Sequence, residues 1–475
     1  MTHQPINQST KQQMAKEMHL EGKNTVVVGL GVTGRAVARF LRSRGAAVCA
    51  ADSADPQPLA AAAAEMAALG VETKIGPHSS ETFAGADLIV VSPGVPHTLG
   101  PLREAAGRGV PVIGEIELAC RFMSTPIVAV SGTNGKTTTT TLIGRMLEAA
   151  GMQVFVGGNI GNPLIGFVDS GEKAQIAVVE ISSFQLDTAD TFRPKVAVML
   201  NVAEDHLDRY PDMDAYIASK ARLFRNQRPD DDAVFNASDP RVRAMGEAAV
   251  SRRLPFGWAQ DIDAAATEGA VLTAEGIRVK MAPLGTVDIS LADFGLPGPH
   301  NRENAAAAVL AAMAAGADAK RTEAVLSAFT GLAHRLERVA TVEGVTFYDD
   351  SKATNVDAVR RALETFSGPV VLLLGGRDKN TDLGPLAQIA AARVQQAVVM
   401  GEAADRLERL LAPVVAVTRV DSMAAAVQTA FSLSRPGMAV LLSPACASFD
   451  WYENYARRGE DFRRQVEALQ RREKA

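Results

Sequence analysis

Short apolar runs recur along this chain, and most of them stop at a glycine or at a group of polar residues. They are too short to be typical helices, so each predicts a strand of a buried parallel sheet. Several are followed by apolar residues at helical spacing, as between residues 142 and 150. This alternation of strand and helix predicts an α/β fold. The clearest runs are residues 25–28, 87–91, 128–130, 176–179, 196–200, 370–374 and 439–442.

Length and the restart of this pattern predict three domains. The chain has 475 residues, about three times a usual domain length of roughly 150. Alternation resumes near Gly331, after short strands and turns over residues 233–295. We expect a Rossmann-like N-terminal domain, a central P-loop ATPase-type domain with a parallel sheet, and a Rossmann-like C-terminal domain. The expected division is a polar tail over residues 1–20, then domains over residues 21–118, 119–330 and 331–475.

Charge and hydropathy argue against two classes of partner. The chain has 49 Lys and Arg against 54 Asp and Glu, a net charge of −5, which leaves no basic excess for nucleic acid. The start of the chain is polar, and no apolar run is long enough to span a bilayer. Three widely spaced cysteines fit a reducing compartment. We expect a cytoplasmic protein that binds neither nucleic acid nor membrane and holds small anions in local sites.

A glycine-rich loop follows the strand at residues 128–130 and opens a helix. Its sequence is Gly132-Thr133-Asn134-Gly135-Lys136-Thr137-Thr138. Loop N–H groups and the positive end of the helix dipole suit phosphate oxygens, Lys136 can reach the outer phosphates, and the Thr137 hydroxyl is placed to bind magnesium. The loop is a shorter variant of the usual P-loop, because Val130 replaces its first glycine. The alternative is an ordinary strand–helix turn with a solvated lysine.

The N-terminal domain carries a second glycine-rich turn, of the form Gly-x-Gly-x-x-Gly. Its glycines are Gly29, Gly31 and Gly34. The next strand ends at Asp52, about where a Rossmann acid meets a ribose hydroxyl. The motif usually indicates NAD, but no hydride-transfer site follows, so the sugar or base of another nucleotide is an equal alternative. A later strand ends in Ser92-Pro93-Gly94, which either lines a ligand crevice or is a tight connection.

Three strands of the central domain end in polar residues near the P-loop. A glycine turn presents Asn159, the next strand ends in Glu180, and a third leads into two acids and His206. A carboxylate at the tip of a buried strand is costly unless paired, and a metal shared with Thr137 would pair Glu180. His206 alone would more often be a capping or core residue, but its acidic neighbours favour metal or phosphate contact. These strand ends predict a magnesium–nucleotide site.

Two helices and the C-terminal strand ends add further candidates. Lys220 follows the acidic cluster on a helix, where it is either a surface base or drawn to carboxylates or phosphate. Asn301 and Asn304 share one face of a first helical turn and either cap it or present amides to a base or phosphate. Ligands bind at strand ends of such sheets, but the spacing does not identify the ligand. The C-terminal candidates are Asp350-Ser351-Lys352-Ala353-Thr354-Asn355, Gly375-Gly376 with Lys379, and residues 443–450.

These motifs occur together and in one order. The set comprises residues 132–137, 158–161, 180–186, 205–210, 300–304, 334–337, 350–355 and 374–376. With this set the sequence resembles the Mur ligase family of peptidoglycan synthesis over almost the whole chain after residue 20. The resemblance implies an ATP-dependent amide ligase that adds D-glutamate to UDP-N-acetylmuramoyl-L-alanine through an acyl phosphate. It also implies that the N-terminal domain binds the UDP of this substrate, not NAD.

The resemblance further implies a role for each candidate. It implies two magnesium ions, one on Thr137 and Glu180 and the other on His206 and Lys220, with Lys220 as its carbamate. The implied catalytic residues are Lys136, His206, Lys220 and Arg335, of which Arg335 approaches the transferring phosphate. ATP is implied at Gly132, Thr133, Asn134, Gly135, Lys136, Thr137, Thr138, Asn301, Asn304, Arg335 and, through its ribose, Asp350. The acceptor is implied at Val32, Thr33, Asp52, Ser53, Ser92, Pro93, Gly94 and Asn159, and D-glutamate at Thr354, Lys379, Ser448 and Tyr455.

Three other activities are compatible with parts of the pattern. A sibling ligase would add L-alanine to UDP-muramic acid or extend folate with glutamate. A non-catalytic protein would bind a nucleotide as a switch, and an oxidoreductase would use the N-terminal motif for a dinucleotide.

Tyr455 stands where the family pattern has phenylalanine. The tyrosine keeps the aromatic ring and adds a hydroxyl. We expect a monomer that acts on small substrates.

Overall fold

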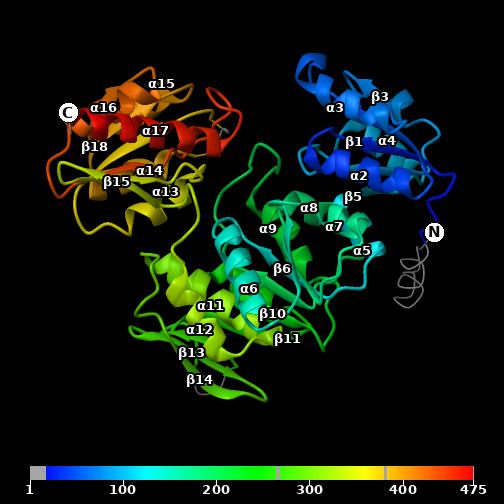
Figure 1. The fold of residues 1–475 in the computed structure, drawn as a ribbon, viewed down its shortest axis with the longest axis horizontal. Coiled ribbons are helices and arrows are strands. Elements are labelled where there is room, and N and C mark those ends of the chain that lie inside the picture. The colour runs from blue at the N-terminus through cyan, green and yellow to red at the C-terminus, as the bar shows by residue number, and fades with distance from the viewer. Residues whose placement is uncertain (1–17, 264–267, 379–381, 474–475) are drawn as a thin grey trace.

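The chain forms three bodies, each built around its own sheet (Figure 1). The computed structural model describes residues 18–263, 268–378 and 382–473. The three sheets have five, nine and six strands. In Figure 1 the N-terminal and C-terminal bodies lie on opposite sides above the central body. The predicted α/β class and three-domain architecture are confirmed.

The N-terminal sheet is fully parallel, in the order β3-β2-β1-β4-β5. Strand β1 turns sharply into helix α2, and a Cβ on Gly34 would lie 1.7 Å from the carbonyl oxygen of Gly29, so this position needs glycine. Its strands are β1 (Asn24–Val28), β2 (Ala47–Asp52), β3 (Glu72–Ile75), β4 (Leu88–Val91) and β5 (Val112–Gly114). Its helices are α2 (Val32–Ser43), α3 (Pro56–Ala68), η1 (Ser80–Phe83) and α4 (Gly100–Gly107).

The central sheet is mixed, whereas the sequence predicted a parallel one. Its order is β14-β13-β12-β11-β10-β9-β6-β8-β7, and the pairs β12–β13 and β13–β14 are antiparallel. The N–H of Thr273 donates to the carbonyl of Gly276 at 2.9 Å in the turn before β13. So short a turn cannot make the crossover that a parallel pair requires. The strands are β6 (Ile127–Ser131), β7 (Val154–Gly158), β8 (Ile176–Glu180), β9 (Val196–Met199), β10 (Asp232–Asn236), β11 (Arg252–Trp258), β12 (Gly269–Leu272), β13 (Gly276–Met281) and β14 (Gly285–Ser290).

One central helix is almost entirely enclosed. Helix α11 (Pro299–Ala314) is rich in alanine, and its side chains from residue 304 to residue 313 are all buried. Small side chains let it pack closely on helix α6 and on the sheet, in one shared apolar core. The Asn301 and Asn304 end of this helix is therefore held rigidly. The helices of this domain are α5 (Glu115–Arg121), α6 (Lys136–Ala149), α7 (Leu164–Ser170), α8 (Ser183–Asp187), α9 (Met213–Ala221), η2 (Arg222–Phe224), α10 (Pro240–Glu247), α11 and α12 (Ala319–Ala328).

The C-terminal sheet has the order β15-β16-β20-β17-β18-β19. Only its edge strand β15 is antiparallel, through a hairpin with β16, and the other pairs are parallel. Three parallel strand ends therefore meet at one edge, which is where predicted ligand residues lie. The strands are β15 (Glu337–Val342), β16 (Val345–Asp349), β17 (Val370–Gly375), β18 (Val394–Met400), β19 (Ala416–Arg419) and β20 (Ala439–Leu442). The helices are α13 (Val356–Leu363), α14 (Gly384–Arg393), α15 (Ala404–Leu411), α16 (Met423–Ser432) and α17 (Tyr455–Glu473).

Helix α5 ties the N-terminal body to the central one, and the expected boundary after residue 118 falls inside this helix. Its Glu117 accepts the N–H groups of residues 190–192 at 2.8 to 3.2 Å. Its Glu115 accepts the N–H of Ile165 at 2.7 Å, and burial raises the pKa of this carboxyl to about 7. These two buried acids fix α5 on the central domain.

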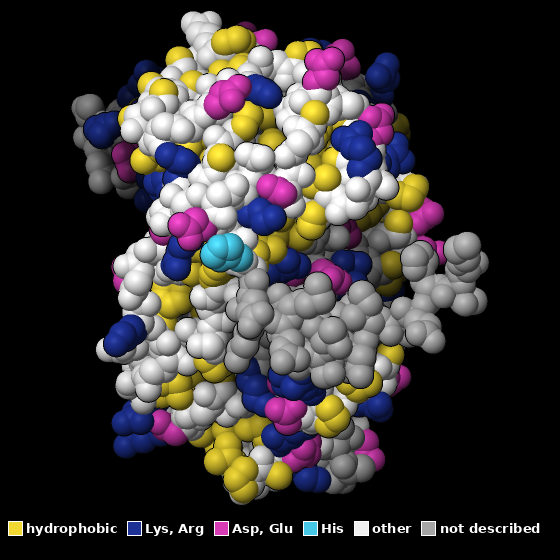
Figure 2. Space-filling model, turned by 90° about the vertical axis from the view of Figure 1, so that its right-hand side faces the viewer, with side chains coloured by type: hydrophobic (Ala, Val, Ile, Leu, Met, Phe, Trp, Pro, Cys, Tyr) yellow, Lys and Arg dark blue, Asp and Glu magenta, His cyan; other side chains and the backbone are white. Residues whose placement is uncertain are grey.

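The surface charge and the hydropathy of the helices can be compared with the expectations from the sequence. Acidic and basic side chains are intermixed on the described parts of the face shown in Figure 2. Within residues 18–263, 268–378 and 382–473, no helix is long and apolar enough to cross a membrane.

Candidate active site

The phosphate loop joins strand β6 to helix α6, as predicted. Gly132 and Gly135 have φ values of 149° and 87°, which favour glycine. A Cβ on Gly135 would also lie 2.2 Å from Oδ1 of Asn304. The Lys136 ammonium donates to the carbonyls of Gly132 and Thr133 at 2.9 and 2.8 Å. The lysine thus lies over its own loop, at the N-terminus of α6 where phosphate binding is favourable.

Glu180 connects the phosphate loop to a second loop. The Thr137 hydroxyl donates to Oε2 of Glu180 at 2.7 Å, and Nδ2 of Asn159 donates to Oε1 at 2.9 Å. Glu180 is only 2% exposed. Arg335, from the C-terminal side, donates to the Thr137 hydroxyl oxygen. Four candidates from distant segments therefore meet at one hydroxyl–carboxylate pair.

His206 and Lys220 both lie near the ring of Tyr216. The Lys220 Nζ is 4.7 Å from the centre of the Tyr216 ring, and the ring centroids of His206 and Tyr216 are 6.3 Å apart. The Tyr216 hydroxyl lies 3.1 Å from Oγ1 of Thr133, which joins this cluster to the phosphate loop. His206 adopts a left-handed φ of 59° and its Nε2 is 3.7 Å from Oδ2 of Asp205. Burial and the charge of Lys136 hold the pKa of Lys220 well below its ordinary value.

A small cavity of about 90 Å³ lies between the central and C-terminal domains beside the phosphate loop. Asn301, Asn304, Arg335 and Asp350 all line it, together with Asn134, Gly135 and Thr138. The Asp350 carboxylate accepts the Ser443 hydroxyl at 2.9 Å and the Leu336 N–H at 3.2 Å. Burial raises its pKa to about 7. Seven of the predicted ATP residues, from two domains, thus face one space, whereas Gly132, Thr133, Lys136 and Thr137 do not line it.

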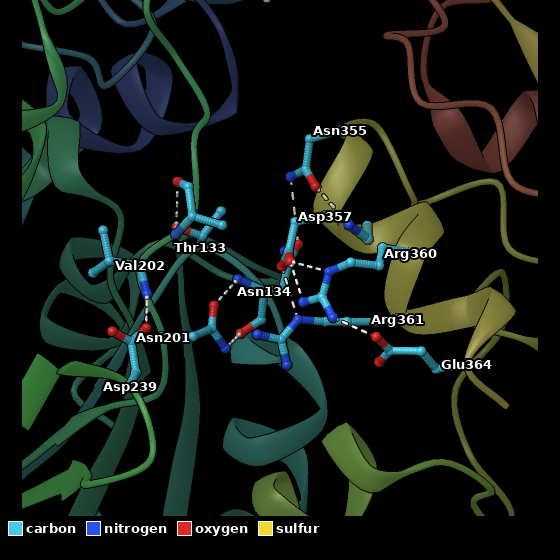
Figure 3. Close-up of polar contacts among 12 residues, drawn as sticks. Thr133, Asn134, Asn201, Val202, Asp239, Asn355, Asp357, Arg360, Arg361 and Glu364 are labelled. Atoms are coloured by element: carbon cyan, nitrogen blue, oxygen red, sulfur yellow. Dashed lines mark hydrogen bonds and ion pairs between the residues drawn. The ribbon is translucent and has the colours of Figure 1, made fainter. Parts of the chain in front are cut away.

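Amide side chains bridge the same two domains (Figure 3). The Asn134 Nδ2 donates to Asp357 at 2.8 Å, and the Asn355 Nδ2 donates to Asp205 at 3.0 Å. Asn355 also caps helix α13, because its Oδ1 accepts the N–H of Ala358 at 2.8 Å. The N-terminus of α13 is therefore attached to the edge of the phosphate loop.

A second cavity, of about 640 Å³, lies between the N-terminal and central domains. Its lining includes every residue that the resemblance assigned to the acceptor: Val32, Thr33, Asp52, Ser53, Ser92, Pro93, Gly94 and Asn159. The Asp52 carboxylate accepts the N–H groups of Leu30 and Ala54 at 2.7 and 2.9 Å, so it also shapes the glycine turn. His78 and Gln185 line this cavity as well. His78 was missed because nothing in its local sequence indicates a ligand.

The residues assigned to D-glutamate lie on separate segments of the C-terminal domain. Thr354 follows β16, the buried Ser448 follows β20, and Tyr455 begins α17. The Lys352 Nζ lies 4.0 Å from the centre of the Tyr455 ring. The Ser351 hydroxyl donates to the Tyr455 carbonyl at 2.7 Å, which joins two of these segments. Lys379 falls outside the described residues.

Two further features had no clear signal in the sequence. His334, Glu337 and Asp349 form a compact group whose ligand-type atoms lie within 4.8 Å of one another. The Asp349 carboxylate pairs with Nδ1 of His334 at 2.7 Å, and Glu337 accepts the His334 N–H at 3.0 Å. Both His334 and Leu336 have left-handed φ values, 63° and 49°, on either side of Arg335. The group thus holds the turn that aims Arg335 at Thr137.

Three domain families match the chain in succession. They are the Mur ligase MurD-like N-terminal domain over residues 23–114, the Mur ligase middle domain over residues 130–312 and the Mur ligase glutamate ligase domain over residues 334–446. The chain belongs to the Mur ligase family, as the resemblance predicted. As a Mur ligase, it is an ATP-dependent enzyme of peptidoglycan precursor synthesis.

Curated relatives match almost the full length. The chain is 51% identical to the UDP-N-acetylmuramoylalanine--D-glutamate ligase of Desulfosudis oleivorans over 454 residues, covering 96% of this chain and 98% of that one. It is 49% identical to the ligase of the same name from Desulfatibacillum aliphaticivorans, covering 95% and 100%. Among solved structures, a pseudomurein peptide ligase type C from Methanothermus fervidus superposes with a TM-score of 0.59 at 18% identity, covering 94% and 100%. MurF from Acinetobacter baumannii gives 0.54 at 19% identity, covering 89% and 86%. The structural matches support the fold alone.

Proposed function

We propose that the chain joins D-glutamate to UDP-N-acetylmuramoyl-L-alanine and converts ATP to ADP and phosphate. The observation that carries this proposal is the junction of two sites at Glu180. Asn159 lines the acceptor cavity and bonds Glu180 at 2.9 Å, while Thr137 of the phosphate loop bonds the same carboxylate at 2.7 Å. An acceptor carboxylate in this cavity would lie beside the terminal phosphate of ATP, which is what acyl-phosphate formation requires.

The chain's own residues supply binding and charge for the first step. The Lys136 ammonium leaves its loop carbonyls to reach the outer phosphates, and Arg335 approaches the transferring phosphoryl group from the opposite domain. Asn301 and Asn304 face the nucleotide, and Asp350 holds its ribose. The acceptor carboxylate attacks the terminal phosphorus and ADP leaves.

The second step forms the amide. Thr354, Lys379, Ser448 and Tyr455 hold D-glutamate so that its neutral amine attacks the acyl carbon. The attack forms the C–N bond and the nitrogen releases a proton; the tetrahedral intermediate then collapses to the amide, and phosphate departs with the former carboxylate oxygen. Positive charge on Lys136 and Arg335 stabilises the phosphate as it leaves. The alternation of an open and a closed interface between the central and C-terminal domains admits ATP and then excludes water.

The donor set fits magnesium. The Thr137 hydroxyl and the Glu180 carboxylate are hard oxygen ligands 2.7 Å apart and would hold one ion. His206 and Lys220 would hold a second, with Lys220 as its carbamate. The buried, weakly basic amine of Lys220 is suited to reaction with carbon dioxide. Magnesium, when bound, neutralises charge on the transferring phosphoryl group. We also propose that the enzyme is a monomer and that it is located in the cytoplasm.

Replacing Lys136 tests the nucleotide part of the proposal. Lys136→Ala should lower ADP formation by about 100-fold or more, because a preorganised charge is removed from the transition state. The exposed Lys320→Ala on helix α12 is the matched control and should keep wild-type activity. Circular dichroism should report the same fold for both variants. Full activity in folded Lys136→Ala would overturn the assignment of the loop.

A further inference from the structure

Arg458 lies in the first turns of helix α17 and is 3% exposed. Its guanidinium makes five hydrogen bonds. The Nε donates to the Ser351 hydroxyl at 3.1 Å. The Nη1 donates to the carbonyls of Gly375 and Ala447 at 3.2 and 3.3 Å, and the Nη2 donates to those of Ser351 and Cys446 at 2.9 and 3.1 Å. All five acceptors are neutral, and they belong to three separate segments.

Two of the segments are the loops that follow strands β16 and β20, and the third is the end of strand β17, at Gly375; the three strands are parallel neighbours. The loop after β16 carries Thr354, and the loop after β20 carries Ser448. The chain after β17 leads to Lys379, and Tyr455 lies on the same helix as Arg458. The described segments that carry Thr354, Ser448 and Tyr455 are thus each bonded to Arg458 or continuous with a residue that is.

The packing around the guanidinium is close. A Cβ on Gly376 would lie 2.9 Å from Nη1 of Arg458 and 2.1 Å from the Ala447 carbonyl. No carboxylate among the described residues lies within ion-pair distance of Arg458. Asp349 pairs instead with His334, and Asp450 accepts the N–H of Glu402 at 3.1 Å. Burial lowers the pKa of Arg458 to about 10, which leaves it charged at neutral pH. A buried cation with only dipolar acceptors is costly, and the five hydrogen bonds to the three segments offset that cost.

We propose that Arg458 is a positioning residue for the amino-acid site, which fixes the relative places of three segments at the ends of parallel strands. This inference rests on the proposed function, because it takes D-glutamate as the occupant of that site. The planar guanidinium group explains why this residue is an arginine. Its five donors match five acceptors on three segments, whereas a lysine has three donors around a point charge.

The test compares Arg458→Lys with Arg457→Lys on the same helix. Arg457 is exposed and pairs only with Glu460 at 2.9 Å, so it is a matched control. In Arg458→Lys the KM for D-glutamate should rise about tenfold or more, because several charge-assisted bonds are lost. The KM values for ATP and the UDP-linked acceptor should stay within about twofold, and Arg457→Lys should leave all three within that range. An unchanged KM for D-glutamate, or equal rises in all three, would overturn the inference.

Two further measurements keep the test decisive. If Arg458→Lys does not fold, Ser351→Ala provides a smaller change. It removes one acceptor of Arg458 and should raise the KM for D-glutamate by about threefold. An unchanged value would contradict the proposal. Hydrogen exchange of Arg458→Lys should be faster in all three segments than in the rest of the C-terminal sheet, whichever amino acid the enzyme uses. Uniform exchange across the domain would overturn the positioning role, even if the substrate assignment failed.

Discussion

Two substitutions of Lys220 can distinguish its effect on the free energy of unfolding from its effect on the reaction rate. Lys220 is 1% exposed, and its Nζ lies over the face of the Tyr216 ring. No carboxylate in the described parts of the chain lies within ion-pair distance of its Nζ, and burial with the charge of Lys136 lowers its pKa strongly. A permanent cation at this position would therefore be buried outside any ion pair, with only the more distant carboxylates of Asp205 and Glu180 to offset its charge.

Two substitutions of similar size have opposite expected effects on the free energy of unfolding. In Lys220→Arg the guanidinium stays charged, so the free energy should fall by about 3–5 kcal/mol. Lys220→Met fills the space without charge and should leave this free energy unchanged or raise it by about 1 kcal/mol. Both changes remove the carbamate, so both should lower the rate at least about 100-fold, as expected when a metal ligand is lost.

Urea unfolding followed by circular dichroism measures the first effect, and ADP release measures the second. Wild-type activity should fall in buffer depleted of carbon dioxide and return with bicarbonate, while neither variant should respond. An active Lys220→Met variant, or a wild-type protein indifferent to bicarbonate, would refute the carbamate. Lys220→Arg protein as stable as the wild type would refute the reasoning from burial.

Three other substitutions test separate parts of the account. Asp52→Ala removes the acceptor for two N–H groups of the glycine turn, so the KM for the UDP-linked acceptor should rise about 10- to 100-fold in steady-state assays, and an equal rise for ATP would contradict the site assignment. Asn355→Asp keeps the cap on α13 but faces Asp205 with a second carboxylate; because like charges repel at this interface, the KM for ATP should rise about tenfold, and an unaltered KM would remove the proposed bridge. The Glu115 carboxyl has a folded pKa of about 7, above about 4.3 in an unfolded chain. The folded state then binds more protons, so the free energy of unfolding falls as pH rises through this window. Glu115→Gln should flatten that slope in urea unfolding at several pH values, and an identical slope would show that another group titrates.

Local chemistry explains which parts of this molecule could be predicted from the sequence. The phosphate loop was found because its glycines, its lysine and the following helix are adjacent in the chain. Strand ends indicated only a possible ligand crevice at Asp52 and at Ser92-Pro93-Gly94, since parallel strands bring their carboxyl ends to one edge, and the resemblance supplied the rest of the acceptor set. The antiparallel edge of the central sheet was missed, because the hairpin at Thr273 has no pattern that distinguishes it from a loop in an isolated sequence.

Contacts between distant segments account for most of what was missed. The bonds of Arg458 to Ser351 span 107 positions, and the bond of Asn355 to Asp205 spans 150. Neither periodicity nor spacing reports which side chains such segments bring together. Arg458 also resembles any other basic residue of an amphipathic helix until its burial is known.

The most direct measurement of the central claim is ADP release from a matrix of acceptors and amino acids. The acceptors are UDP-N-acetylmuramic acid, UDP-N-acetylmuramoyl-L-alanine and folate, each offered with L-alanine, L-glutamate or D-glutamate. We predict ADP release and a new amide product only with UDP-N-acetylmuramoyl-L-alanine and D-glutamate. Turnover with folate and L-glutamate, or with UDP-N-acetylmuramic acid and L-alanine, in place of that pair would contradict the proposed function, as would ADP release that does not depend on any amino acid.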